Sequence, residues 1–184
     1  MNNIKSTAPA ACAALMLLMC GASNAADTSA VPVEHAGAPA KAWGVERSTS
    51  ALTGKGRLVG RLESSNTVPN SIGREEKVIL MVRCTPEGGL ESYVAWPAFI
   101  GTQPVEVTYR FDSEPLVKQG WNASESGKAT GLFKSPAGAA FLDKLSTASR
   151  FVIQSPRYSS TPVEAAFDLA EAAEVITEAR KTCS

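Results

Sequence analysis

Alternating apolar and polar residues predict that most of the chain from Trp43 onward forms strands. Segment 104–112 is the clearest case, because its apolar residues point to one side and its polar residues to the other, as in a strand with one buried face. Segment 77–84 is apolar on both faces, which is typical of a central, buried strand. The turn residues 85–89 and the alternating segment 90–96 complete an antiparallel hairpin with it.

Weaker patterns predict the remaining strands. These are expected at 56–63, 120–124, 129–133, 150–154 and 163–169. The polar residues 64–66 are expected to end the first of these strands, residues 69–76 to form a loop, and Thr161-Pro162 to form the turn between the last two.

Two helices are expected besides the strands. Residues 137–149 carry apolar side chains at helical spacing. The Ala- and Glu-rich segment 169–182 is the second helix, and its expected inner stripe is Leu169, Ala172, Ala173 and Ile176. Alternating strand–helix–strand crossovers are missing from this order. The predicted fold class is therefore α+β and mostly antiparallel β, a sandwich or partial barrel with one inserted helix and a C-terminal helix.

Residues 1–25 have the layout of a secretory signal peptide. A basic start is followed by an apolar run of about 12 residues, and the small residues Ser23 and Ala25 precede the expected cleavage point. This run is shorter than the ~20 residues that a membrane span needs. A lipoprotein signal with Cys20 as the lipidated residue is an alternative, but the bulky Met19 before it argues against lipidation. We therefore expect a periplasmic protein.

Beyond the signal peptide, we expect a flexible linker over 26–42 and a single β-rich domain over 43–184. The linker holds six alanines, two prolines and His35, the one histidine of the chain. The total of 184 residues favours a single domain. A domain without histidine cannot assemble a Ser-His-Asp or Cys-His arrangement.

Removal of the predicted signal peptide changes which cysteines are available to form a disulfide. The chain has four, but only Cys84 and Cys183 remain after removal of residues 1–25. An even pair in an oxidising compartment predicts a disulfide. Two unrelated buried thiols are the alternative.

Composition and motifs exclude several classes of function. The 18 basic and 18 acidic residues balance, which disfavours a nucleic-acid partner. The chain has neither a glycine-rich phosphate loop nor a nucleophile elbow, so we predict no catalytic residue, no cofactor and no metal. A hydrolase using Asp112 or Asp168 remains a minor alternative.

Aromatic and polar residues cluster at the ends of three predicted strands. The residues concerned are Trp96, Arg110, Asp112, Trp121 and Ser124. A tryptophan beside an arginine and an aspartate on one sheet face can form a binding patch. It can equally form a stacked, ion-paired support for the sheet, and the sequence leaves both interpretations open.

The order of these groupings resembles the VasI/TagO family of type VI secretion system-associated proteins. The similar motifs run from about Trp43 to Cys183. They are Ser50-Ala51-Leu52-Thr53, Val82-Arg83-Cys84, Tyr93-Val94-Ala95-Trp96, Tyr109-Arg110-Phe111-Asp112, Trp121-Asn122-Ala123-Ser124, Phe141-Leu142-Asp143-Lys144-Leu145 and Phe167-Asp168-Leu169. Two positions depart from the family pattern, because Ser126 stands where an Asp is usual and Ala170-Glu171 where Ser-Gly is usual.

The resemblance implies a non-enzymatic periplasmic accessory protein that binds a protein partner, with components of the secretion apparatus as candidates. A second interpretation is a periplasmic inhibitor or binding module for a cell-wall hydrolase. In that case an exposed loop such as 124–128 would enter the cleft of the enzyme. Neither interpretation involves nucleic acid or a membrane span.

Overall fold

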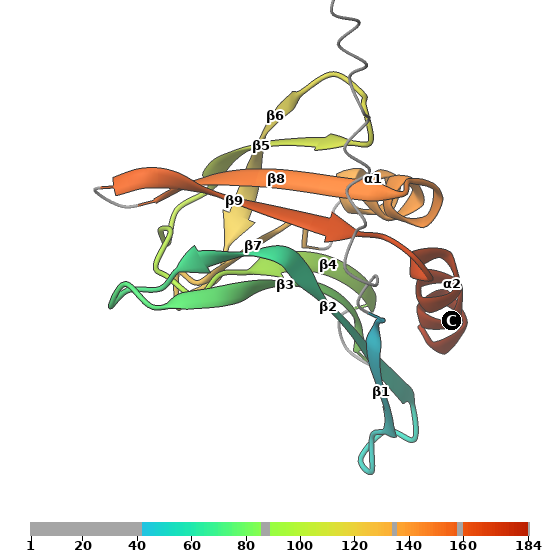
Figure 1. Cartoon of the computed structure of the whole chain (residues 1–184). Coiled ribbons are helices and arrows are strands. Elements are labelled where there is room, and N and C mark those ends of the chain that lie inside the picture. Colours follow the sequence, from blue (N-terminus) through green and yellow to red (C-terminus); the bar gives the residue numbers. More distant parts are fainter. Residues whose placement is uncertain (1–41, 86–88, 134–135, 158–159, 184) are drawn as a thin grey trace, which may run out of the picture. The chain divides into compact units, whose positions relative to one another are not determined.

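The computed structural model describes residues 42–85, 89–133, 136–157 and 160–183 (Figure 1). The predicted signal peptide, nearly all of the predicted linker and most of the turn 85–89 lie outside these residues. Within the described ranges the chain forms nine strands and two helices. They are β1 (Gly44–Thr49), β2 (Gly56–Pro69), β3 (Glu75–Thr85), β4 (Gly89–Ala95), β5 (Val105–Phe111), β6 (Val117–Ala123), β7 (Ala129–Gly131), α1 (Pro136–Thr147), β8 (Arg150–Arg157), β9 (Ser160–Asp168) and α2 (Ala172–Thr182).

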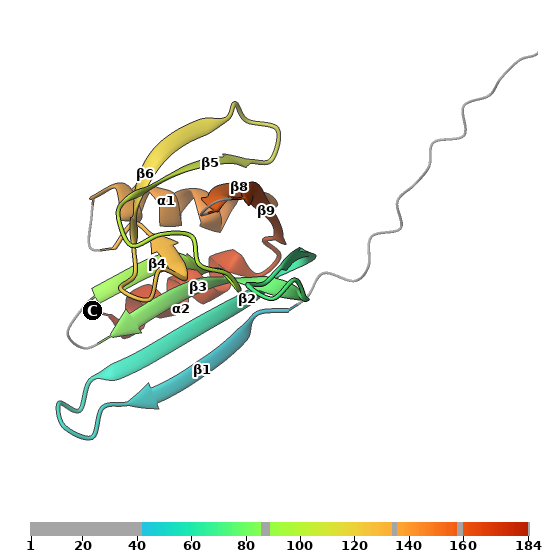
Figure 2. The ribbon, with the colours of Figure 1, turned by 90° about the vertical axis from the view of Figure 1, so that its left-hand side faces the viewer.

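The strands form one open antiparallel sheet, as the sequence predicted. Their order is β1-β2-β3-β4-β7-β6-β5-β8-β9. The sheet folds over, so that β8 and β9 lie opposite β2, β3 and β4 (Figures 1 and 2). The expected α+β, mostly antiparallel fold is confirmed.

Strand β2 continues through residues 64–66, which the sequence predicted as its end. The register with β3 shifts between Glu63 and Thr67, so these polar residues form an irregularity within the strand. Two of their side chains donate hydrogen bonds to the backbone of β9. Ser65 Oγ donates to Ala166 O at 3.0 Å, and Asn66 Nδ2 donates to Glu164 O at 2.7 Å. The bulge thus joins β2 to β9, where the two margins of the folded sheet meet.

The core lies between the folded halves and beneath the helices. Strand β5 behaves as predicted: Val105, Val107 and Phe111 are buried, while Glu106 and Arg110 are exposed. Aromatic rings from β5, β6, α1 and β8 fill one part of this core, and the Phe141 ring lies 5.1 to 5.8 Å from those of Trp121, Phe151, Phe111 and Tyr109.

Helix α2 packs against β2 and β3 through a stripe that differs in part from the predicted one. Ala172 and Ile176 are buried as expected, but Ala173 is exposed, and Val175 and Ala179 complete the stripe. The helix begins at Ala172, three residues later than predicted, so Leu169 is buried before the helix rather than within its stripe.

The approach of α2 to β2 depends on Gly60. A Cβ atom at this position would lie 2.8 Å from Val175 Cγ1 and 3.3 Å from the Trp43 ring. Only glycine leaves room for the helix at this distance from the strand.

The last two strands form a hairpin whose turn is displaced from the predicted position. Thr161 and Pro162 lie in β9 rather than in the turn that the sequence predicted. Proline is tolerated here because β9 is the last strand of the sheet and its register with β8 shifts next to Pro162.

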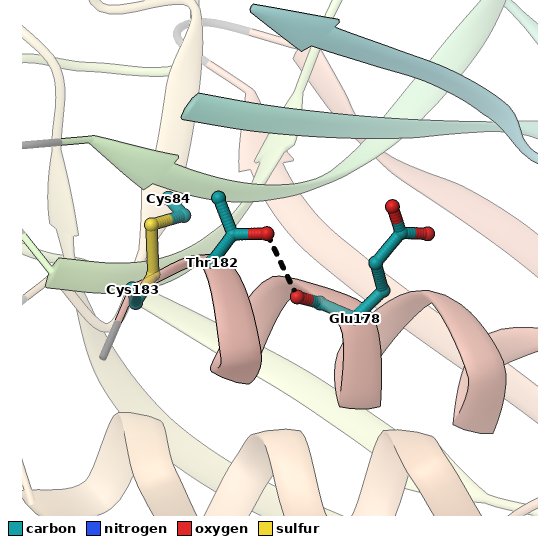
Figure 3. The surroundings of a disulfide bond; sticks show 4 residues. All are labelled: Cys84, Glu178, Thr182 and Cys183. Carbon is teal, nitrogen blue, oxygen red and sulfur yellow. Dashed lines mark hydrogen bonds between the residues drawn. A yellow bond between two sulfur atoms is a disulfide. The ribbon is translucent and has the colours of Figure 1, made fainter. Parts of the chain in front are cut away.

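A disulfide between Cys84 and Cys183 joins the end of β3 to the residue after α2, as predicted (Figure 3). The two Cα atoms are 5.6 Å apart across a sequence separation of 99. In the preceding turn of the helix, Thr182 Oγ1 donates to Glu178 O at 2.9 Å. The C-terminal helix is therefore held to the sheet covalently as well as by packing.

Candidate functional site

Both tryptophans of the predicted patch belong to the core. Trp96 is 3% exposed, and its Nε1 donates to Thr130 Oγ1 at 3.2 Å. Trp121 is 1% exposed, and its Nε1 donates to Gln119 Oε1 at 3.3 Å. The two indoles support the sheet from inside and present no surface to a ligand.

Asp112 fixes a corner between strands. It has a φ of 45°, a conformation that Asp tolerates better than most residues. Its carboxylate accepts hydrogen bonds from Arg150 N at 2.9 Å and Ser149 N at 3.1 Å, and its own backbone N donates to Arg150 O at 2.9 Å. These bonds tie the end of β5 to the start of β8.

Ser124 organises the turn between β6 and β7. Its Oγ accepts from Ala129 N at 3.1 Å and contacts Ser126 Oγ at 3.0 Å, and its backbone N donates to Ala129 O at 2.8 Å. Gly127 in the same turn lies against Phe99, whose ring would be 2.2 Å from a Cβ at this position. The turn is held by its own hydrogen bonds and by the neighbouring segment.

Arg110 is the residue of the predicted patch that borders a groove. It lies on the outer face of β5, opposite to the face that buries Trp121, so the five predicted residues do not form one surface. The groove has a volume of about 340 Å³ and runs over the outer face of β5, β8 and β9. Its lining residues are Thr108, Tyr109, Arg110, Leu116, Arg150, Val152, Gln154 and Glu164.

Two exposed arginines stand close together in this groove. Arg110 pairs with Val152 across β5 and β8, and Arg150 lies two residues before Val152, so the two arginines are diagonal neighbours on one face. Asp168 lies opposite Arg150 on β9, but its carboxylate accepts from Ala170 N. Within the described part of the chain, neither guanidinium forms an ion pair.

Several other arginines of the domain have acidic partners. Arg61 pairs with Glu46 at 2.6 Å and Arg83 with Glu91 at 2.6 Å, and Arg47 forms a two-pronged pair with Glu178. Arg110 and Arg150 therefore differ from these by leaving their planar donor groups available in a concave surface. Guanidinium groups bind carboxylate and phosphate oxygens through paired hydrogen bonds, so the groove is suited to an anionic group.

Tyr109 closes the inner side of the groove. Burial raises the pKa of its phenol, and the hydroxyl donates to Gln119 Oε1 at 2.9 Å. The neutral phenol connects the groove to the aromatic core, and it provides no charge to the site.

Sequence reasoning identified Arg110 but missed the rest of the groove. Arg150 and Gln154 alternate with buried residues in a predicted strand, so their shared face could have been recognised. Their position beside Arg110 could not be recognised, because β8 follows helix α1 in the sequence but lies next to β5 in the sheet.

The described residues contain no group of three or more His, Cys, Asp or Glu side chains placed to hold a metal ion. In the same part of the chain, neither helix is sufficiently long and apolar to cross a membrane.

None of the protein-family models matches the chain. No curated protein matches it either. Among solved structures, invasion associated protein B from Bartonella henselae is similar, with a TM-score of 0.47 and 13% identity over 76% of this chain and 92% of that one. This similarity carries no functional argument.

Proposed function

We propose that this protein is a non-enzymatic binding protein of the periplasm and that the groove lined by Arg110 and Arg150 is its ligand surface. The single observation that carries the proposal is the pair of exposed guanidinium groups, diagonal neighbours across β5 and β8 and without an acidic partner among the described residues. The ligand is an acidic group on a protein partner.

Two further features support a periplasmic location. Residues 1–25 have the pattern of a signal peptide. The disulfide between Cys84 and Cys183 is of a kind that persists in oxidising compartments and is rare in the cytosol. By its resemblance to the VasI/TagO family, the protein acts as an accessory of a type VI secretion apparatus.

A charge-matched pair of variants tests this function. The tagged protein is expressed in its native periplasm, crosslinked and purified together with its partners. We expect wild type to recover a component of the secretion apparatus and the Arg110→Ala/Arg150→Ala variant to lose it. Arg57→Ala/Arg74→Ala removes the same charge at exposed positions outside the groove and should recover the component as wild type does. Wild type that recovers no such component contradicts the secretion role, and equal recovery by the groove variant contradicts the site.

The turn over 124–129 favours a second candidate, an inhibitor of a cell-wall hydrolase. Its internal hydrogen bonds and its contact with Phe99 hold a short exposed loop in one conformation, which lowers the entropic cost of entering an enzyme cleft. Inhibition of purified lysozymes and amidases by the mature protein, lost when Gly127 is replaced by Val, would support this role. A panel without inhibition would remove it.

A further inference from the structure

Strand β6 lacks a neighbour along most of one side. Val117–Trp121 pair with β5, but on the other side only Asn122 and Ala123 pair with β7, which ends at Gly131. Among the described residues, no strand continues beside residues 117–120.

The register identifies the backbone groups on this open side. Ser124 N donates to Ala129 O, so Ser124 and Ala129 are a hydrogen-bonded pair. Hydrogen-bonded pairs recur at every second residue of an antiparallel ladder, so the backbone N–H and C=O of Asn122 also point toward β7. Because strand residues alternate in direction, Gly120 and Lys118 direct their N–H and C=O groups toward the same side. Because β7 ends before it reaches these residues, the N–H and C=O groups of Gly120 and Lys118 face away from the sheet.

The open side is also sterically free. On the outer face of the sheet, a Cβ placed on Gly120 would meet no atom within 4 Å, so side chains of a strand laid beside β6 would meet no obstacle above this residue. Exposed apolar side chains adjoin it at the hairpin turn, where Leu116 is 67% and Val117 is 42% exposed. The margin of the sheet at β9 differs, because Asn66 covers part of β9 with hydrogen bonds to its backbone. Exposed strand edges of this kind accept an added strand from another chain.

Charge indicates what kind of strand fits here. Lys118 and Gln154 both pair with Thr108, and Arg110 follows Thr108 on the same face of β5. Lys118, Arg110 and Arg150 therefore cross the outer face of β6, β5 and β8 as a diagonal row of cations. A strand added beside Lys118 is stabilised by acidic side chains on its outer face.

We infer that β6 binds an extended, acidic segment of a protein partner as an additional antiparallel strand. The backbone of that segment pairs with Lys118 and Gly120, and a carboxylate on its outer face lies next to the Lys118 ammonium. This inference rests on the proposed function in taking a protein as the ligand, but its surface is the edge of β6 and not the groove.

The test uses synthetic peptides as probes. One is a ten-residue peptide of alternating Glu and Val; the second has the same sequence with every other backbone amide N-methylated; the third has Lys in place of Glu. Binding to the mature, disulfide-bonded protein is measured by fluorescence anisotropy. We expect the Glu peptide to bind, and the N-methylated and Lys peptides to bind at least about tenfold more weakly, because each loses hydrogen bonds or charge pairing.

Two substitutions at one position separate the backbone from the side chain. Gly120→Pro removes an N–H that points away from β5, and we expect about a tenfold loss of affinity for the Glu peptide. Gly120→Ala keeps the N–H, fits the open space and should bind like wild type. Circular dichroism checks that both variants fold. If Gly120→Pro does not fold, the N-methylated peptide decides the question on the wild-type protein.

Three outcomes would overturn the inference. Equal affinity for the Glu peptide and its N-methylated form would mean that charge alone holds the peptide. Equal affinity of Gly120→Pro and Gly120→Ala would place the peptide elsewhere. Concentration-dependent dimers that Gly120→Pro abolishes, without peptide binding, would make a second copy the occupant. The groove is tested separately, since Arg110→Ala/Arg150→Ala leaves the β6 backbone intact.

Discussion

The side-chain oxygen Oδ1 of Asn66 accepts a hydrogen bond from the backbone N of Ala166 at 2.9 Å, across 100 positions of sequence. A single side chain thus satisfies part of the unpaired backbone of the last strand, where the folded sheet does not close. Asn66→Ala should lower the free energy of unfolding by about 1–3 kcal/mol, because the backbone N–H and the Glu164 carbonyl lose their partner. Urea denaturation measures the effect.

The control for this prediction is Asn122→Ala, which removes the same amide from an exposed position on β6. It should change stability by less than about 0.5 kcal/mol. Equal effects of the two substitutions would mean that the link between β2 and β9 has no stabilising role.

The disulfide should account for a large part of the stability. Removing a native disulfide from a small domain costs about 2–5 kcal/mol, and the long loop between Cys84 and Cys183 favours the upper part of this range. Cys84→Ser and Cys183→Ser should therefore each destabilise the protein in thermal unfolding.

Thiol labelling supplies the control for the disulfide. The mature protein, unfolded without reductant, should show no reactive thiol. Treatment with dithiothreitol should lower the melting temperature of wild type and leave that of the Cys84→Ser/Cys183→Ser variant unchanged. Two labelled thiols in the unreduced wild type would contradict the bond in solution.

Gly60 should not tolerate a side chain. Gly60→Ala places a Cβ 2.8 Å from Val175 Cγ1, so α2 or Trp43 must shift, and we expect a loss of about 1–3 kcal/mol in stability. Gly120→Ala is the matched control on an open strand, and its stability should stay close to that of wild type. Chemical denaturation of both variants checks this. The same cost at both glycines would mean that the contact with α2 is not its cause.

Tyr109 should make stability sensitive to high pH. Burial raises the pKa of its phenol above the usual value for tyrosine, so the unfolded chain loses this proton first as the pH rises. The stabilisation that the protonated phenol provides is complete below the pKa that it has in the unfolded chain. It is lost as the pH rises through the pKa that it has in the folded protein. Tyr109→Phe should therefore reduce the fall in stability above pH 10, measured by urea unfolding at several pH values. An unchanged slope would assign the alkaline sensitivity to other groups.

The sequence predicted the parts of this fold that depend on local alternation. Val105, Val107 and Phe111 could be assigned to one buried face because every second residue of β5 is apolar. The cysteine pair could be predicted because Cys84 and Cys183 are the two that follow the predicted signal peptide. The polar residues 64–66 predict the end of a strand. The strand continues because their partners, Glu164 and Ala166, lie about a hundred positions away, which no local pattern can indicate.

The candidate site was less predictable for the same reason. Trp96 and Trp121 have the residue type of a binding patch, but their burial depends on which strands cover them. Arg110 was recognised from its alternation in β5, whereas its neighbour Arg150 comes from a strand that follows β5 only after two further strands and a helix. Adjacency across a sheet is a property of topology and is not visible in spacing.

The disulfide also divides the chain into two mechanical parts. Residues 84 to 183 form a covalently closed ring that contains β4 to β9 and both helices, while β1, β2 and most of β3 lie outside it. A cut in any loop of the ring leaves both fragments attached to each other. A pulling force between the N-terminal side and Cys183 passes directly through the sulfur atoms, so it can unravel β1 to β3 but cannot extend the groove or the β5–β6 hairpin.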